Sequence, residues 1–334
     1  MARRAFVLAA LLLALSLPAS AQQKNDAVSV GLVISLSQSP FYIALEKGYL
    51  TDEHIAVDDS AFRGAQDMIA SLATGRLDVS LGAINAGFFN AENQGLDLRA
   101  VAALGIQPSP VIATPPILRK DLWDSGAIRS GKDLKGRKVA VNTPGAIPEY
   151  LLTLILQKYR MTLKDVDETS LGFPQQPIAL QNGGIDMGFV PEPFATTAIR
   201  DGTAVLLAPD AGVGAGDITT MVFFSGAFMR ERRAVAVRFL RALLRGAADT
   251  QGDYTRRPEI AALLAKATGL KLENIAASTP FVIDPLLDIA KNVDSLRRQE
   301  KIHMANGQIN YSTPAPLDKL IDASLIREAA ASPR

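Results

Sequence analysis

The feature that most constrains the fold is an arrangement of strands, helices and glycines that occurs twice along the chain. The pattern Leu-x-x-Gly-x-Leu-Asp at residues 72–78 returns as Leu-x-x-Gly-x-Ile-Asp at residues 180–186. Val30 lies 45 residues before the glycine of the first copy, and Val139 lies 44 residues before that of the second. The two copies begin at residues 72 and 180, and this spacing exceeds the roughly 20–50 residues of a solenoid repeat. It predicts two α/β lobes of similar construction.

Each half alternates short β-branched runs with apolar-periodic segments that end at glycine, which is typical of α/β folds. In the first half the pattern predicts strands over 28–34, 55–57, 77–81 and 98–103, with helices over 41–47, 65–73 and 85–93. In the second half it predicts strands over 138–141, 185–189 and 204–208, with helices over 149–159, 177–181 and 193–200. The Ser39-Pro40 pair marks the first helix start, because serine caps a helix and proline is tolerated in its first turn.

The lobe boundaries follow from two extended stretches. Residues 107–116 are proline-rich and suit a first crossing, and the apolar residues 219–224 suit a second, so the two together form a hinge. We therefore expect lobe I to comprise residues 28–112 and 225–334, and lobe II residues 113–224. From Arg230 onward the chain is expected to be mostly helical, with the arginines of residues 232–245 on a solvated face of a helix.

The N-terminus predicts an export signal over residues 1–21. Arg3 and Arg4 precede an apolar run at 5–17, and Ala-Ser-Ala at 19–21 suits cleavage. The run is shorter than the roughly 20 residues that a membrane-spanning helix needs. No cysteine follows it to carry a lipid, so a periplasmic protein without a stable membrane anchor is expected. A buried N-terminal helix is the alternative.

Composition narrows the function to binding. The 334 residues include no cysteine and two histidines, and their formal net charge is +1. This balance excludes a basic surface for nucleic acid, and it argues against cysteine or histidine chemistry and a metal site. No cofactor is expected. Because neither His54 nor His303 lies in a predicted strand-end turn, an enzyme would depend on Glu149 or Glu192 as base.

Ligands of open α/β sheets bind beyond the carboxyl ends of the strands, where helix N-termini offer free N–H groups. Six such turns occur, three in each lobe, and they contain small residues that allow close approach to the backbone. The candidate ligand-binding residues in or beside these turns are Ser37, Gln38, Phe41, Arg63, Gly64 and Asn85 in lobe I, and Thr143, Gly145, Ala146, Tyr150, Gln175 and Glu192 in lobe II.

Several of these residues allow two interpretations. Arg63 is the one cation in the turns, and it either pairs with a ligand anion or forms an ion pair within the protein. Glu192 either accepts from a ligand amine or hydroxyl, or bridges the lobes. The aromatic residues near the turns, among them Phe41 and Tyr150, serve either the core or ligand stacking.

Four segments resemble the solute-binding proteins of the nitrate/sulfonate/taurine class of ABC importers. They are PFYIALEKGYL at 40–50, LATGRLDV at 72–79, DLKGRKVA at 133–140 and ALQNGGID at 179–186, the last followed by Pro-Glu-Pro at 191–193. The resemblance covers residues 28–225 and is weaker in the helical tail.

The resemblance implies a two-lobed type II periplasmic-binding-protein fold, in which each lobe is a mixed sheet flanked by helices and the cleft lies at a two-strand hinge. It implies a monomer that captures a small polar or anionic solute and delivers it to a membrane permease driven by an ATPase. Sulfonates, nitrate, taurine and aromatic acids are the expected solutes. The alternatives are a binder of pyrimidine or flavin precursors and a periplasmic lyase or dehydratase-like enzyme on the same fold.

Overall fold

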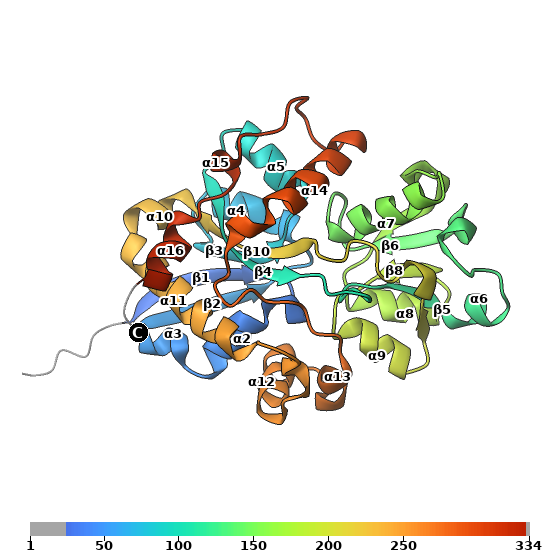
Figure 1. The fold of residues 1–334 in the computed structure, drawn as a ribbon, viewed down its shortest axis with the longest axis horizontal. Coiled ribbons are helices and arrows are strands. Elements are labelled where there is room, and N and C mark those ends of the chain that lie inside the picture. Colours follow the sequence, from blue (N-terminus) through green and yellow to red (C-terminus); the bar gives the residue numbers. More distant parts are fainter. Residues whose placement is uncertain (1–24, 332–334) are drawn as a thin grey trace, which may run out of the picture.

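The computed structural model describes residues 25–331, and these form two lobes, each built on a five-stranded mixed sheet flanked by helices (Figure 1). The predicted export signal lies outside the described residues. Among the helices described, none is both long and apolar enough to cross a membrane.

Lobe I is built on a sheet with the strand order β2-β1-β3-β10-β4. Its strands are β1 (Asp26–Leu32), β2 (Ile55–Ala61), β3 (Val79–Ala83), β4 (Leu98–Ile106) and β10 (Ile218–Ser225). Strand β1 pairs in parallel with β2 and β3, whereas β10 runs antiparallel to both β3 and β4. All eight residues of β10 are buried, as expected for an interior strand with covered faces.

Lobe II repeats this arrangement with the order β7-β6-β8-β5-β9. Its strands are β5 (Pro116–Arg119), β6 (Lys138–Val141), β7 (Asp167–Ser170), β8 (Met187–Phe189) and β9 (Ala204–Leu206). Strands β5 and β7 were not predicted from the sequence. The first begins with a proline, and the second is a polar edge strand that pairs only with β6, so neither has the apolar alternation that indicates a strand.

The helices lie between and around the strands. In lobe I they are η1 (Leu36–Gln38), α2 (Ser39–Glu46), α3 (Tyr49–Asp52), η2 (Ala65–Met68), α4 (Ile69–Ala73), α5 (Ala86–Asn93), α10 (Gly226–Glu231), α11 (Arg233–Asp249), η6 (Tyr254–Arg256), α12 (Pro258–Thr268), α13 (Leu272–Ala277), η7 (Ile289–Asn292), α14 (Val293–Ala305), α15 (Leu317–Leu320) and α16 (Ser324–Ala331). In lobe II they are α6 (Lys120–Asp124), η3 (Gly131–Leu134), α7 (Ile147–Lys158), η4 (Leu163–Asp165), α8 (Gln175–Gln181), α9 (Phe194–Arg200) and η5 (Ala208–Asp210).

The two crossings between the lobes have the same form. Each time the chain changes lobe, the next strand inserts antiparallel into the fourth position of the sheet it enters: β5 after the first crossing, and β10 after the second. This corrects the predicted lobe boundary after residue 224. Because β10 pairs with β3 and β4, residues 218–224 belong to the sheet of lobe I, and the second crossing precedes them. The extended conformation of 219–224 was predicted, but its partners were not.

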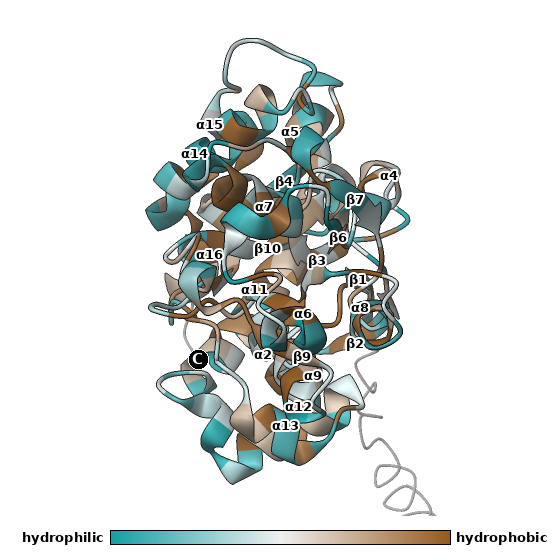
Figure 2. Ribbon diagram, turned by 90° about the vertical axis from the view of Figure 1, so that its right-hand side faces the viewer, coloured by the Kyte–Doolittle hydropathy of each residue, from teal (hydrophilic) through white to brown (hydrophobic). Residues whose placement is uncertain are grey.

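Helix α11 packs its apolar face on lobe I. Phe239, Leu240 and Leu243 are fully buried, and α11 packs against α2 and α16. The helices of Figure 2 show alternating brown and teal stretches, as expected for helices that bury one face.

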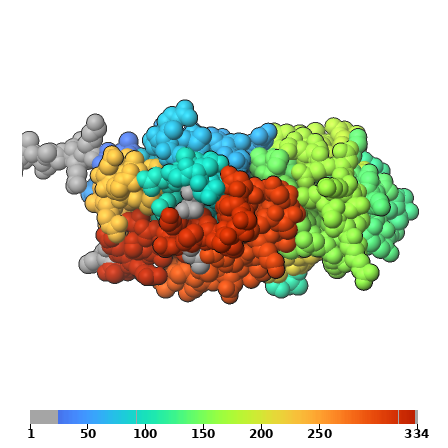
Figure 3. Space-filling view, turned by 90° about the horizontal axis from the view of Figure 1, so that it is seen from above, coloured from blue at the N-terminus to red at the C-terminus, as the bar shows by residue number. Residues whose placement is uncertain are grey.

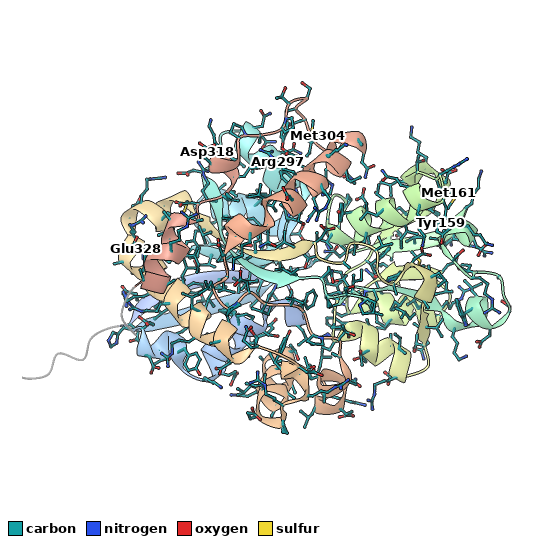
Figure 4. The ribbon with its side chains drawn as sticks, in the orientation of Figure 1. Tyr159, Met161, Arg297, Met304, Asp318 and Glu328 are labelled. Carbon is teal, nitrogen blue, oxygen red and sulfur yellow. The ribbon has the colours of Figure 1, made fainter. Side chains whose placement is uncertain are left out.

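The arginines along α11 were expected on a solvated face, but they form ion pairs. Arg238 pairs with Asp26 at 2.5 Å, Arg245 with Asp52 at 2.9 Å, and Arg241 binds both carboxylate oxygens of Glu53. Arg233 pairs with Glu328 of α16, which is labelled in Figure 4, at 2.5 Å. The basic face of α11 is therefore matched by acidic residues from other segments of lobe I.

The C-terminal helices also contact lobe II. Figure 3 shows the red and orange C-terminal residues directly against the green lobe. Asn306, just after α14, donates to Thr153 of α7 at 3.0 Å, and Asn274 of α13 donates to Thr197 of α9 at 3.0 Å. The C-terminal segment therefore forms hydrogen bonds to lobe II on two sides of the boundary between the lobes.

Candidate functional site

A pocket lined by eight polar and nine apolar residues lies between the lobes, at the ends of strands from both sheets. About 490 Å³ at this position is free of protein atoms, a figure that includes space open to solvent. Its polar lining consists of Ser35, Ser37, Gln38, Asn85, Thr219 and Thr220 from lobe I, and Thr114 and Asn142 from the first crossing and lobe II. Apolar walls come from residues such as Phe281 and Phe173. This is the position where α/β sheets bind ligands.

Three hydroxyl groups from lobe I form a hydrogen-bonded chain in the lining. Thr220 Oγ1 donates to Ser37 Oγ at 2.9 Å, and Ser37 Oγ donates to Ser35 Oγ at 3.0 Å. Ser35 also caps η1, because its Oγ accepts from the backbone N–H of Ser37 at 3.1 Å. The chain links the turn after β1 to β10, two segments that are more than 180 residues apart.

Two amide side chains of lobe I are held by the protein. Gln38 Nε2 donates to the carbonyl of Leu81 at 2.9 Å. Asn85 caps α5, since its Oδ1 accepts from Phe88 N at 2.9 Å and its Nδ2 donates to the carbonyl of Ala83 at 3.1 Å. Both amides are therefore rigid parts of the pocket wall.

Lobe II contributes the turn between β6 and α7. Asn142 Nδ2 points to the carbonyl of Arg63 at 3.5 Å, whereas Asn142 Oδ1 is buried without a hydrogen-bond partner. Thr143 Oγ1 is also buried without a partner. Ala146 and the first residues of α7 complete this wall, with Pro148 in the first turn of the helix. Unpaired buried polar atoms are uncommon in folded proteins and mark this turn as unusual.

Direct hydrogen bonds hold the lobes together around the pocket. The backbone N–H of Ala86 donates to the carbonyl of Gly145 at 2.9 Å, and that of Leu36 donates to the carbonyl of Glu192 at 2.9 Å. The Glu192 carboxylate accepts from Thr196 N at 3.0 Å in its own lobe and from Thr279 N at 3.2 Å in the tail. Glu192 thus bridges the lobes, which is one of its two predicted roles.

The twelve predicted ligand-binding residues fall into three groups. Ser37, Gln38, Asn85 and Ala146 line the pocket. Arg63 and Gln175 line a neighbouring groove between the lobes, together with residues such as Phe62 and Pro174. The other six, which are Phe41, Gly64, Thr143, Gly145, Tyr150 and Glu192, are not part of the pocket lining.

Those six residues have other surroundings. Phe41 is buried in the core of lobe I beside Phe239, and Tyr150 donates to Asp217 at 2.8 Å, so both aromatics have the packing role that was the alternative to stacking. Gly64, Thr143 and Gly145 lie where the lobes touch behind the lining: a Cβ atom at Gly64 would be 3.0 Å from Thr143.

Seven polar or aromatic lining residues are absent from the twelve predicted ones: Ser35, Thr114, Asn142, Phe173, Thr219, Thr220 and Phe281. Ser35 and Asn142 stand at strand ends, so the rule that selected their neighbours extends to them. Thr219 and Thr220 lie in the stretch that was interpreted as a crossing. Phe281 enters from the helical tail, and nothing in its local sequence indicates this.

The lining contains no titratable side chain among the described residues. Arg63, the predicted partner for an anion, is more than half exposed in the neighbouring groove and lies 3.5 Å from Asp67. The buried carboxylate nearest the lining along the chain is Glu192, which follows Pro191. Burial raises the pKa of the Glu192 carboxyl, although the hydrogen bonds from Thr196 and Thr279 oppose this shift.

A second polar cluster joins α7 to the tail. Glu149 accepts from the backbone N–H of Gly145 at 2.5 Å and from Gln308 Nε2, and Gln308 Oε1 lies 2.7 Å from His303 Nδ1. Burial raises the pKa of Glu149 and lowers that of His303. These groups lie at the contact between the lobes and outside the pocket lining.

Glu168 of β7 provides a test of the electrostatics of lobe II. Burial, and secondarily the charge of Glu149, raise its pKa to about 7. Since its unfolded value is about 4.3, its ionised form opposes folding above pH 7, and this penalty disappears as the pH falls toward 4. We expect Glu168→Gln to raise the melting temperature at pH 8 and to change it little at pH 4.5, as measured by calorimetry.

The neighbouring exposed carboxylate offers a control for this prediction. Asp167→Asn removes a charge from the same strand but from an exposed position, so it is expected to change the melting temperature little at either pH. A Glu168→Gln protein that melts below the unmodified protein at pH 8 would contradict the assignment.

Comparison with known proteins identifies a family for the chain and several solved structures that share its fold. The family model described as NMT1/THI5 like matches residues 36–256, which is more than half of the chain. No curated protein sequence matches significantly. Among solved structures, a ligand-binding component of an ABC-type import system from Staphylococcus aureus, with zinc bound, superposes with a TM-score of 0.76 at 15% identity, covering 92% of this chain and 100% of that one.

Two further solved structures are of proteins that are named for the ligand they bind. The periplasmic nitrate-binding protein NrtA from Synechocystis PCC 6803 gives a TM-score of 0.73 at 15% identity, covering 92% and 89% of the two chains. The alkanesulfonate-binding protein SsuA from Xanthomonas axonopodis pv. citri, bound to MOPS, gives 0.67 at 20% identity, covering 91% and 97%. At identities this low, the superpositions show a common fold. They confirm the two-lobed architecture that the repeat predicted. With most of its length matched by one family model, the chain belongs to the NMT1/THI5-like family.

Proposed function

We propose that this chain is the substrate-binding component of an ABC importer. It captures a small solute in the periplasm by closing two lobes around it, and it then delivers the solute to a membrane permease. The observation that carries the proposal is the polar pocket, whose lining comes from both lobes and whose rim is held by hydrogen bonds between them.

The geometry explains how a solute favours the closed form. A ligand that contacts Ser35, Ser37 and Asn142 at once binds the closed arrangement better than the open one, and it shifts the population toward closure. A shift from 1:99 to 99:1 needs about 5.5 kcal/mol of differential binding. A few hydrogen bonds from each lobe, at about 0.5–1.5 kcal/mol each, together with the contacts between the lobes, are of that order.

Several findings support this role. The solved relatives with similar folds include an import-system component, a nitrate-binding protein and a sulfonate-binding protein. The predicted export signal at residues 1–21 suits the periplasm. We propose a monomer, because one chain supplies both walls of the pocket.

Catalysis is the second candidate, because the same fold carries enzymes. The desulfurization enzyme DszB gives a TM-score of 0.58 at 14% identity, and a mutant of DszB was solved in complex with biphenyl-2-sulfinic acid. The chain described here has no cysteine, and the described pocket lining has no group that transfers protons at neutral pH. Binding without turnover is therefore favoured.

A ligand screen tests the proposal. The purified protein is heated with sulfonates, nitrate, taurine, aromatic carboxylates, pyrimidines and flavins, and its scattering radius is measured with each hit. A true ligand at 100 times its Kd stabilises the folded state by about 2.7 kcal/mol, and it should also compact the protein. Binding without compaction would contradict closure, and mass spectrometry that finds the hit chemically converted would favour the enzyme.

A further inference from the structure

The described lining of the pocket combines polar and apolar residues but carries no charged side chain. Its eight polar residues are serines, threonines, asparagines and glutamine. Arg63 lies in the neighbouring groove, and Glu192 is a potential anion behind Pro191. An ion that loses its water on entering such a pocket finds no opposite charge, which makes its burial costly.

The hydroxyl chain of lobe I leaves one donor free. Ser35, Ser37 and Thr220 hold three hydroxyl protons, and the two bonds between them use two. The third proton, at one end of the chain, has no acceptor among the described residues. When each bond runs from Thr220 toward Ser35, the free proton belongs to Ser35, whose oxygen already accepts from Ser37 N. This wall therefore offers an O–H donor to whatever fills the pocket.

The wall of lobe II leaves an acceptor free. The carbonyl of Arg63, 3.5 Å from Asn142 Nδ2, sets the orientation of that amide, because an amide oxygen there would face another oxygen. Asn142 Oδ1 is then left as an acceptor, on a residue that is 4% exposed, with no partner. An acceptor buried in this way is costly unless a ligand donates to it.

We propose that the pocket selects a solute without net charge that accepts a hydrogen bond from the Ser35–Ser37–Thr220 hydroxyls and donates an N–H or O–H to Asn142. Carboxamides, sulfonamides and similar polar groups carry this donor and acceptor pair. Nitrate and sulfonates carry acceptors only, so they leave Asn142 Oδ1 unpaired. The inference rests on the proposed function and names its solute class. Because donor and acceptor come from different lobes, such a solute also favours closure.

Matched probes that differ mainly in charge test the solute class. Binding is measured at pH 7.5 by calorimetry for benzamide against benzoate, nicotinamide against nicotinate, and methanesulfonamide against methanesulfonate. At least one neutral probe is expected to bind ten times more tightly than its anionic partner. Tighter binding of the anions overturns the inference and leaves the proposed function standing. Binding of none of the probes also overturns it, and if nitrate and taurine then fail as well, the proposed function falls with it.

A substitution at Asn142 tests the geometry on the best neutral probe. Asn142→Leu removes the acceptor and is expected to weaken binding about tenfold. Gln157→Leu removes an exposed amide from α7 and serves as the control, with unchanged binding. Asn142→Leu binding as tightly as the control would overturn the assignment.

Discussion

Replacing Gly64 with valine is expected to weaken solute binding by up to about a hundredfold while each lobe still folds. Gly64 has φ −160° and ψ 164°, an extended conformation that valine adopts without strain. A Cβ atom there would lie 3.0 Å from Asn142 Nδ2 and from both Thr143 Cγ2 and Thr143 Oγ1. These atoms belong to the opposite lobe, so the two methyl groups of valine would separate the lobes.

The magnitude follows from the cost of overpacking. Extra carbon atoms in a filled interface cost about 1–3 kcal/mol, and a hundredfold loss corresponds to about 2.7 kcal/mol. Opening relieves the clash, so the penalty is expected in closure rather than in folding. Calorimetry with a ligand from the screen measures the loss, and scattering should show that the variant does not compact.

A matched variant distinguishes the clash between the lobes from a general effect of introducing valine. Ser60→Val places the same side chain at an exposed position of β2, close to Gly64 in the chain, and should bind normally. Should the Gly64→Val protein bind and compact as well as the Ser60→Val protein, the lobes do not close at this point as the structure describes.

Replacing Gly246 with alanine is expected to destabilise the protein by about 3 kcal/mol, at the upper end of typical overpacking. Gly246 lies within α11, where alanine is favoured over glycine by about 1 kcal/mol on helix propensity alone. Packing decides otherwise, because a Cβ atom at this position would lie 2.0 Å from the backbone carbonyl oxygen of Pro40 in α2. Backbone atoms of a packed helix do not move aside as a side chain does.

Gly87 provides the opposite case. It lies in α5, and the three atoms nearest to a Cβ atom there would belong to the amide group of Gln66, an exposed and flexible side chain that is able to rotate away. Gly87→Ala is therefore expected to be neutral or slightly stabilising. Urea unfolding of both variants measures the difference, and a Gly246→Ala protein as stable as Gly87→Ala would show that α2 and α11 are not packed this closely.

From local signals, the rule that ligands bind at strand ends selected four residues that line the pocket, and their role in ligand binding stays a prediction. Ser37, Gln38, Asn85 and Ala146 all stand where a predicted strand leads into a helix, and all four line the pocket. The same rule also selected Gly64 and Thr143, which stand at strand ends but lie in the lobe contact. A strand-end position can be predicted from a few neighbouring residues, whereas the direction in which its side chain faces depends on how two distant turns meet.

Contacts between remote segments account for what was missed. Strand β10 was predicted as extended, but its place between β3 and β4 depends on pairing with residues more than 110 positions away. The hydrogen bond between Gln308 and Glu149 joins residues 159 positions apart, and no local pattern marks either as a contact between lobes. From the sequence, the arginines of α11 are equally compatible with a solvated helix face. Their ion pairs become apparent only in the structure, because the acidic partners are remote in sequence.

The sequence by itself predicted most of the strands and helices in their order, the repeated lobe and the general position of the site, because strand alternation, helix periodicity and glycine or proline breaks are short-range effects. Only the tertiary structure decided that Arg63 lies outside the pocket lining, that Glu192 joins the lobes, and that Asn142 lines one uncharged pocket together with Ser35, Ser37 and Thr220. Those properties depend on which residues of the two lobes are in contact. Long-range packing determines these contacts, and local conformational preferences of the chain do not.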